Sequence, residues 1–142
     1  MRRSNIFVKN NRILLYLFEN YCLTIKIQNK ILELLKPDYI RGLSILGGNP
    51  TEPQNEPELI DFIRRVRDYY SDTKDVWLWS GHTFEELIER EDKLLPLCDV
   101  LVDGPFIEAK KDLTLAFRGS SNQRIVDVKK SLIEKTVVLL EI

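Results

Sequence analysis

Three short apolar segments of this chain each end in a glycine-containing turn, and this recurrence constrains the fold more than any other feature. The segments and their turns are residues 43–46 with Gly47-Gly48-Asn49-Pro50, residues 76–79 with Ser80-Gly81, and residues 100–102 with Asp103-Gly104. Helical patterns separate them, which predicts an α/β chain of parallel strands with flanking helices. In a right-handed succession of this kind the strand ends lie on one rim, where ligands bind in open sheets and in barrels.

The segments between these strands carry helix signals. Apolar residues at helical spacing run from Ile27 to Leu35 before Pro37, and they predict a helix that the proline ends. Asn55 is a candidate N-cap for a second helix, since Pro57 follows in its first turn and an apolar face continues to Tyr70.

Signals of the same kind continue towards the carboxyl end. Residues 83–86, Thr-Phe-Glu-Glu, match a capping box and predict the start of a third helix. Beyond it we expect a strand at 125–128, a short helix at 129–134 and a final strand at 137–140. Residues 1–25 show weak periodicity and no clear caps, so no element is predicted there.

Composition narrows the functional classes. The chain has 142 residues, 44% of them hydrophobic, which suits one domain with a real core. A formal net charge of −1 argues against nucleic-acid binding and offers no attraction to a membrane surface. The apolar run from Ile13 to Phe18 is shorter than the roughly 7–15 residues of a signal peptide core. We therefore expect a cytoplasmic protein with no nucleic-acid or membrane partner.

Two cysteines, Cys22 and Cys98, are the only ones in the chain. Their spacing matches no disulfide framework, zinc site or iron–sulfur ligand set. We expect two reduced and mostly buried thiols, and no metal site built by this chain.

The order of these motifs is similar to a known family. The Gly-Gly-Asn-Pro turn resembles the GGEP/GGDP motif of radical S-adenosylmethionine enzymes. Together with residues 76–81 (VWLWSG), 99–106 (DVLVDGPF) and 118–124 (RGSSNQR), it resembles the activating proteins of anaerobic ribonucleoside-triphosphate reductase. The resemblance extends from about Ile27 to Leu140, and it implies a radical S-adenosylmethionine (β/α) barrel.

The resemblance also implies a chemistry. Proteins of this family hold a 4Fe–4S cluster on a Cys-x-x-x-Cys-x-x-Cys loop, and the cluster binds S-adenosylmethionine. An electron from a flavodoxin-type donor cleaves the sulfonium, and the resulting radical takes a hydrogen atom from a glycine of the reductase. The cofactor supplies this reactivity and the protein positions it. The reductase is the partner that the resemblance implies.

This chain departs from the family at two places. It contains no Cys-x-x-x-Cys-x-x-Cys loop, so the cluster ligands are not present. We expect residues 1–25 to be an unmatched amino-terminal segment and residues 26–142 a partial barrel domain, the result of truncation, an altered start or a frameshift. The second departure is Asn49, which replaces the usual Glu or Asp and would weaken a contact with the methionine ammonium group by about 1 kcal/mol.

Each candidate residue has a functional and a structural interpretation. The cofactor-binding candidates are Gly47, Gly48, Asn49, Pro50, Ser80, Gly81 and Asp103; the alternative is that they form strand-to-helix turns. Residues 118–124 either bind an anion or the reductase, or form a structured surface turn. His82 shows no carboxylate partner by spacing, and Glu85, Glu86, Glu89, Arg90 and Glu91 are typical of a solvated helix face.

Two functions are expected from these observations. The first is an activating protein that is incomplete and inactive alone. The second is a non-catalytic remnant that only binds the reductase or a full-length activator. A weaker third possibility is a nucleotide-binding β/α module unrelated to the family.

Overall fold

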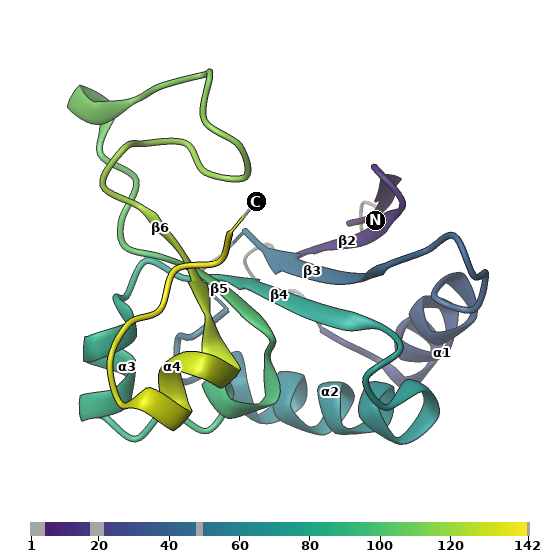
Figure 1. Ribbon diagram of the computed structural model, residues 1–142. Helices are drawn as coiled ribbons and strands as arrows, with labels where there is room; N and C mark the ends of the chain where they lie inside the picture. Colours follow the sequence, from purple (N-terminus) through teal and green to yellow (C-terminus); the bar gives the residue numbers. More distant parts are fainter. Residues whose placement is uncertain (1–4, 18–21, 48–49, 142) are drawn as a thin grey trace.

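A computed structural model describes residues 5–17, 22–47 and 50–141 of the chain as a mixed α/β fold (Figure 1). The strands are β1 (Ile6–Lys9), β2 (Arg12–Tyr16), β3 (Gly42–Leu46), β4 (Asp75–Trp79), β5 (Val100–Asp103) and β6 (Arg124–Asp127). The α-helices are α1 (Ile25–Leu34), α2 (Glu56–Tyr70), α3 (Phe84–Glu89) and α4 (Val128–Glu134). Two short 3-10 turns, η1 (Leu95–Leu97) and η2 (Glu108–Lys110), complete the elements.

The strands form one sheet in the order β1-β2-β3-β4-β5-β6. Neighbours from β2 to β5 pair in parallel, as predicted, because a helix returns the chain to the start of the next strand. The expectation of parallel strands is wrong at both edges, where β1 and β6 run antiparallel to their neighbours. A turn joins β1 to β2, and the segment between β5 and β6 contains no crossover helix. In the described part of the chain the sheet is open, with β1 and β6 at its edges.

The helices begin where their caps predict. The side chain of Thr83 accepts a hydrogen bond from the backbone N–H of Glu86, 3.1 Å away, so Thr83 caps the start of α3 as predicted. Thr24 caps α1 in the same way. Asn55 is the N-cap residue of α2, with Pro57 in the first turn, although its side chain makes no capping hydrogen bond. The final strand expected at 137–140 is reduced to a single bridge between Val126 and Leu139.

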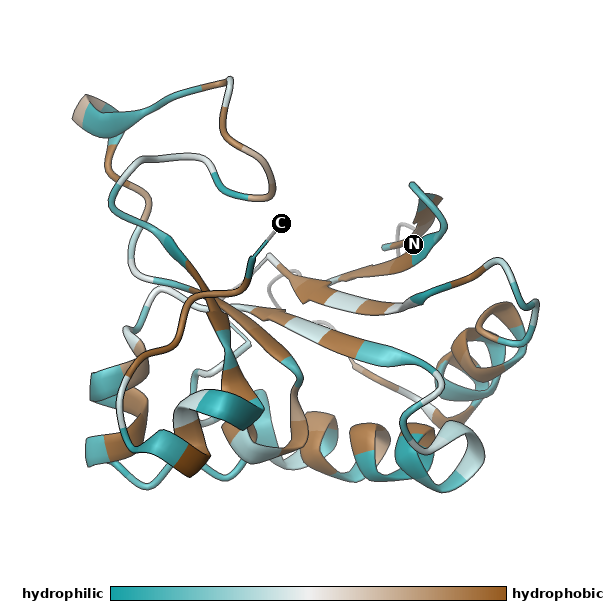
Figure 2. Cartoon of the chain, viewed as in Figure 1, coloured by the Kyte–Doolittle hydropathy of each residue, from teal (hydrophilic) through white to brown (hydrophobic). Residues whose placement is uncertain are grey.

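All four α-helices lie on one side of the sheet (Figure 1). Alternate strand residues, such as Leu43, Val76, Leu78 and Leu101, point to that side and join the main core. The other side carries a smaller cluster around Trp77. Figure 2 shows the apolar residues concentrated on the strands and on the helix surfaces that face them. Among the described residues, no helix combines the length and the hydrophobicity that a membrane crossing requires.

An amino-terminal hairpin extends the sheet in a region where the sequence predicted no element. Asn10 and Asn11 have φ values of 53° and 61°, the left-handed conformation that both central residues of a type I′ hairpin turn adopt. Arg12 then begins β2 as a buried residue. Its guanidinium lies 2.6 Å from Asp75 and donates to the Ser44 hydroxyl at 2.8 Å, so it links β2 to β3 and β4.

Candidate functional site

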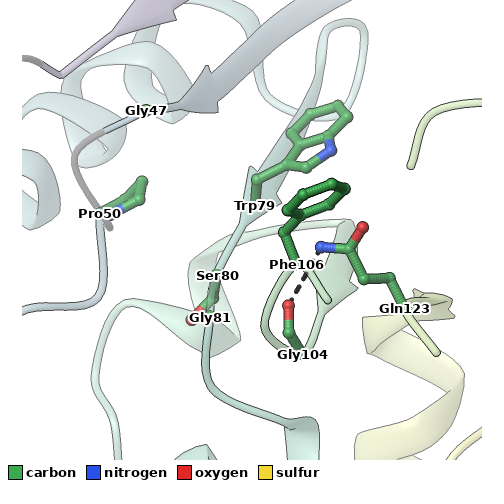
Figure 3. Close-up of a pocket in the computed structure, with 8 residues that line it drawn as sticks. All are labelled: Gly47, Pro50, Trp79, Ser80, Gly81, Gly104, Phe106 and Gln123. Carbon is green, nitrogen blue, oxygen red and sulfur yellow. Dashed lines mark hydrogen bonds between the residues drawn. The ribbon is translucent and has the colours of Figure 1, made fainter. Parts of the chain in front are cut away.

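A pocket of about 210 Å³ lies at the carboxyl ends of three adjacent parallel strands. Gly47 follows β3, Ser80 and Gly81 follow β4, and Gly104 follows β5, so consecutive strand ends supply its wall. Its lining consists of Gly47, Pro50, Trp79, Ser80, Gly81, Gly104, Phe106 and Gln123 (Figure 3). The small residues expose backbone at the wall, and the aromatic rings border it.

Four of the predicted site residues meet at this pocket: Gly47, Pro50, Ser80 and Gly81. Gly48 and Asn49 lie outside the described residues. Asp103 does not line the pocket; its neighbour Gly104 does. The structure therefore brings together the three strand ends that the sequence places on one rim.

Two of the lining residues require glycine for conformational reasons. Gly47 has φ +75°, and a Cβ atom there would lie 3.3 Å from both the backbone nitrogen and oxygen of Leu17. Gly104 has φ +95°, which L side chains rarely adopt. The chain can therefore turn sharply at the ends of β3 and β5 without placing a side chain at these two points of the pocket wall.

Ser80 is a buried residue that ties the pocket wall to the loop after β3. Its Oγ lies 2.6 Å from the Oγ1 of Thr51, and it accepts the backbone N–H of His82 at 3.0 Å. The backbone N–H of Ser80 donates to the Val102 carbonyl at 3.0 Å, which continues the β4–β5 pairing. The side chain is thus held in one place at the pocket edge.

Asp103, the last residue of β5, is buried and forms hydrogen bonds to two neighbouring elements. Its side chain is 1% exposed, and its Oδ2 accepts the backbone N–H of Phe84 at 2.7 Å, at the start of α3. The same oxygen lies 2.6 Å from Arg124 Nη2, and Oδ1 accepts Arg124 Nε at 3.1 Å. Both oxygens are therefore engaged within the chain, where they join β5 to α3 and β6.

Gln123, Phe106 and Trp79 are lining residues that the sequence reading did not assign to the site. Gln123 donates from Nε2 to the Gly104 carbonyl at 3.1 Å, the bond dashed in Figure 3. Its Oε1 accepts the backbone N–H of Gly119 at 2.9 Å. Trp79 donates its indole N–H to the Phe117 carbonyl at 2.9 Å. A side-chain amide that bonds distant backbone leaves no periodic signal in a sequence.

The segment 118–124 is a structured turn whose two cationic ends bond within the chain. Arg118 donates from Nη1 to the Gln123 carbonyl at 2.8 Å. Arg124 contacts Asp103 and lies 2.5 Å from Glu85. The hydrogen bond from Arg124 lowers the pKa of Glu85. These contacts support the surface-turn interpretation of the segment.

His82 has the carboxylate partners that its spacing was thought to lack. Its Nδ1 lies 3.2 Å from Glu86, four residues further along α3, and its Nε2 lies 3.6 Å from Glu52. His82 precedes the N-cap Thr83 and lies outside α3, so the helical spacing rule did not identify Glu86 as its partner. The solvated face predicted for α3 is confirmed, since Glu85, Glu86, Glu89, Arg90 and Glu91 are all exposed. Three of them, Glu85, Glu86 and Arg90, also form side-chain contacts.

Comparison with known proteins shows a family and a set of relatives. A family model described as a 4Fe-4S single cluster domain matches residues 11–126. The chain is 44% identical over 104 residues to a protein of Vibrio cholerae, covering 72% of this chain and 66% of the relative. It is 40% identical over 100 residues to one of Haemophilus influenzae, covering 69% and 64%. It is 37% identical over 91 residues to one of Enterobacteria phage T4, covering 64% and 56%.

All three relatives carry the name anaerobic ribonucleoside-triphosphate reductase-activating protein. The chain spans just under two thirds of the Vibrio and Haemophilus relatives and a little over half of the phage protein. No solved structure matches the chain. The family model also covers residues 11–25, which the sequence reading placed in an unmatched segment.

The residues present do not fit a 4Fe–4S cluster. The chain has two cysteines, whereas such clusters are held by a set of cysteine thiolates. Cys98 is fully buried, its Sγ lies 3.5 Å from the Leu94 carbonyl, and burial raises the pKa of its thiol far above the ordinary range. Only Cys22 is exposed. In the described ranges, no group of three or more His, Cys, Asp or Glu side chains is placed to hold a metal ion.

Proposed function

Because this chain belongs to the 4Fe-4S single cluster domain family, we propose that it provides the S-adenosylmethionine-binding wall of a reductase-activating protein. The pocket at the ends of β3, β4 and β5 is the observation that carries the proposal. The named relatives supply its biological setting, in which the partner is an anaerobic ribonucleoside-triphosphate reductase. Under this proposal the open sheet is part of a radical S-adenosylmethionine (β/α) barrel. The sequential strand order and the helices on one side support that arrangement.

The pocket chemistry suits the ligand. The methionine end carries an ammonium and a carboxylate group, which backbone carbonyls and N–H groups at the exposed Gly47 and Gly81 can bind. The Ser80 hydroxyl adds one further polar group beside them. At about 210 Å³ the pocket is below the roughly 300 Å³ of sites that enclose a whole small molecule. We propose that it holds one moiety of the ligand.

Cleavage of S-adenosylmethionine requires a cluster whose ligands this chain does not provide. A 4Fe–4S cluster held by ligands from outside these residues would supply the electron for cleavage of the sulfonium, and a flavodoxin-type donor would reduce the cluster. Cys22 and Cys98 do not provide its ligand set. We therefore propose that the chain alone binds S-adenosylmethionine without cleaving it, and that glycyl-radical formation on the reductase needs cluster ligands from outside these residues.

Equilibrium dialysis with labelled S-adenosylmethionine tests the binding proposal. Gly81 is exposed at the pocket rim, so Gly81→Val should block the pocket with little effect on the core. Ser121→Val is the matched control, because it places the same side chain on an exposed residue outside the pocket. We expect binding to the wild type and the control and a loss of about tenfold or more in Gly81→Val. Specific binding of a nucleoside triphosphate instead would favour an unrelated nucleotide module.

Anaerobic reconstitution with iron and sulfide tests the second half of the proposal. We expect no stoichiometric four-iron cluster and no 5′-deoxyadenosine, with Cys22→Ser indistinguishable from the wild type. A complete cluster with turnover of S-adenosylmethionine would overturn this part while leaving the binding result intact.

A second candidate function, binding of the reductase or a full-length activator without chemistry, is favoured by the segment between β5 and β6. This segment extends away from the sheet on the side opposite the helices (Figure 1). It carries three exposed apolar side chains: Phe106 at 52%, Leu113 at 88% and Phe117 at 44%. Exposed apolar groups of this kind mark contact surfaces when they lie together.

A pull-down with the reductase tests this candidate. Leu113→Asp changes an 88% exposed residue of this segment that does not line the pocket. Ile133→Asp is the control, since Ile133 on α4 is 80% exposed. Loss of capture only in Leu113→Asp supports docking by this segment. Equal capture by both variants would place the contact elsewhere.

A further inference from the structure

Thr51 connects two walls of the pocket from a fully buried position. It directly follows Pro50, a lining residue, and its own exposure is 0%. Its Oγ1 lies 2.6 Å from the Oγ of Ser80, a second lining residue on the neighbouring strand end. A contact that holds Thr51 in position therefore also holds its neighbour Pro50 and, through the hydroxyl pair, Ser80 at the end of β4.

Arg90, the residue after α3, holds the backbone of Thr51. Its Nη2 donates to the Thr51 carbonyl oxygen. The same guanidinium nitrogen lies 2.9 Å from Asp92 Oδ2 and 3.4 Å from Glu56 Oε1. Arg90 thus extends from the end of α3 to the loop that precedes α2. These contacts leave 33% of its side chain exposed.

Asp92 keeps the guanidinium in place. Its side chain is 0% exposed, and its Oδ1 accepts the backbone N–H groups of Leu94 at 3.0 Å and Leu95 at 2.9 Å. The carboxylate is therefore fixed to the main chain ahead of η1. Burial opposes its ionisation, but hydrogen bonds from Glu56 and Arg90 outweigh burial and lower the pKa of Asp92.

Glu56, the first residue of α2, completes the group. Burial and a hydrogen bond to Asp92 raise the pKa of Glu56 to about 8. Asp92 and Arg90 are the charged groups that act on it. At neutral pH Glu56 therefore carries the shared proton, and Arg90 balances the single negative charge of the pair.

We propose that Arg90 is a positioning residue for the pocket, which holds Thr51 and through it the Pro50 and Ser80 walls in the ligand-binding arrangement. All three contacts are made by Nη2, whose two hydrogens the Thr51 carbonyl and the carboxylates of Asp92 and Glu56 share. The inference rests on the proposed function of the pocket. Its first test, however, needs no ligand.

Hydrogen–deuterium exchange of peptides covering residues 50–58 is that test. Arg90→Gln removes the contact with the Thr51 carbonyl. Arg64→Gln is the control, because Arg64 is an exposed residue of α2 and its loss changes the net charge equally. We expect exchange in this segment to be about tenfold faster in Arg90→Gln and unchanged in the control. Equal protection in both variants would overturn the inference.

Affinity for S-adenosylmethionine is the second test. We expect binding to weaken by about tenfold in Arg90→Gln, the effect of one lost charge-assisted hydrogen bond, with partial recovery in Arg90→Lys. Thr51→Val keeps the shape and removes the hydroxyl, and it should weaken binding by severing the link to Ser80. Unchanged affinity in Arg90→Gln and Thr51→Val, with normal binding by the wild type, would also overturn the inference.

A pH profile separates positioning from a purely structural role. Wild-type affinity should fall from about pH 7 to about pH 9, as Glu56 ionises beside Asp92 and the two carboxylates repel. The α-ammonium group of the ligand also titrates at about pH 8, so Glu56→Gln should leave a shallower decline than the wild type. Identical profiles in the two proteins would count against positioning. If the wild type binds no S-adenosylmethionine at any pH, the proposed function fails, and the exchange experiment alone decides the role of Arg90.

Discussion

Arg124 forms an ion pair with the buried Asp103 across the antiparallel β5–β6 pairing. Its Nη2 lies 2.6 Å from Asp103 Oδ2, and the two residues are direct partners in the strand register. On its other side the guanidinium lies 2.5 Å from Glu85 on α3. Arg124 therefore pairs with one buried and one exposed carboxylate. We expect these two ion pairs to contribute differently to the free energy of unfolding.

Leaving the buried Asp103 without its counter-charge should cost more than removing the exposed carboxylate of Glu85. Arg124→Ala leaves Asp103, 1% exposed, without its counter-charge, and we expect a loss of about 3 kcal/mol in the free energy of unfolding. Glu85→Gln is the comparison, since its side chain is 61% exposed, and we expect less than about 1 kcal/mol. Urea unfolding measures both, and similar losses would contradict this assignment.

The Glu56–Asp92 pair makes stability depend on pH. The folded pKa of Glu56 is raised from 4.5 to about 8, so the folded protein binds more protons than the unfolded chain between these values. The free energy of unfolding should therefore fall as pH rises through this range. Asp92, with its lowered pKa, contributes stability above its ordinary pKa, and this is lost in acid.

Urea unfolding from about pH 5 to about pH 9 checks this prediction. Glu56→Gln should flatten the decline, because the residue no longer ionises. Glu58→Gln makes the same charge change on an exposed residue of the first turn of α2 and should keep the decline. An equal slope in wild type and Glu56→Gln would show that Glu56 is not the titrating group.

Phe117 covers the tryptophans on the side of the sheet away from the helices. Its ring centroid lies 4.9 Å from that of Trp77, and its carbonyl accepts the Trp79 indole N–H. We expect Phe117→Ala to shift tryptophan emission to longer wavelength and to increase acrylamide quenching. Leu113→Ala, at an 88% exposed position of the same segment, should change neither. No shift in Phe117→Ala would mean that the ring does not shield them.

The two thiols should differ sharply in reactivity. Cys22 is exposed and Cys98 is fully buried with a raised pKa, so a thiol-specific disulfide reagent should modify one cysteine in the native protein. Cys98 should react only on opening of the core, slower by at least about a thousandfold. Cys22→Ser should show no fast reaction in a timed absorbance assay. Two fast thiols in the wild type would contradict the buried position of Cys98.

The order of strands and turns made the rim of the pocket predictable. Gly47, Ser80 and Gly104 each follow an apolar strand, and parallel strands end on the same edge of a sheet. The start of α3 was equally predictable, because the hydroxyl of Thr83 and the backbone N–H of Glu86 are neighbours in any helix that begins there. Local signals sufficed for these features.

Features that depend on long-range contacts were not predictable. The β1–β2 hairpin turns on Asn10-Asn11, a weak turn signal, and its stability comes from Arg12 pairing with Asp75, which is distant in the chain. The direction of β6 depends on a connection without a helix. Arg90 has the composition of a solvated face, and only the folded chain brings it to Thr51. Arg12 and Arg90 each contact a residue more than thirty positions away in the sequence.

The most direct measurement of the central claim is a ¹⁵N–¹H spectrum of the chain titrated with S-adenosylmethionine. The account predicts shifts at the backbone amides of Gly81 and Gly104 and at the Trp79 indole, all at the pocket. The Trp77 indole, which does not line the pocket, should move less and serves as the internal reference. Saturable shifts confined to the pocket would support the account. An unchanged spectrum, or shifts centred on the β1 edge, would contradict it.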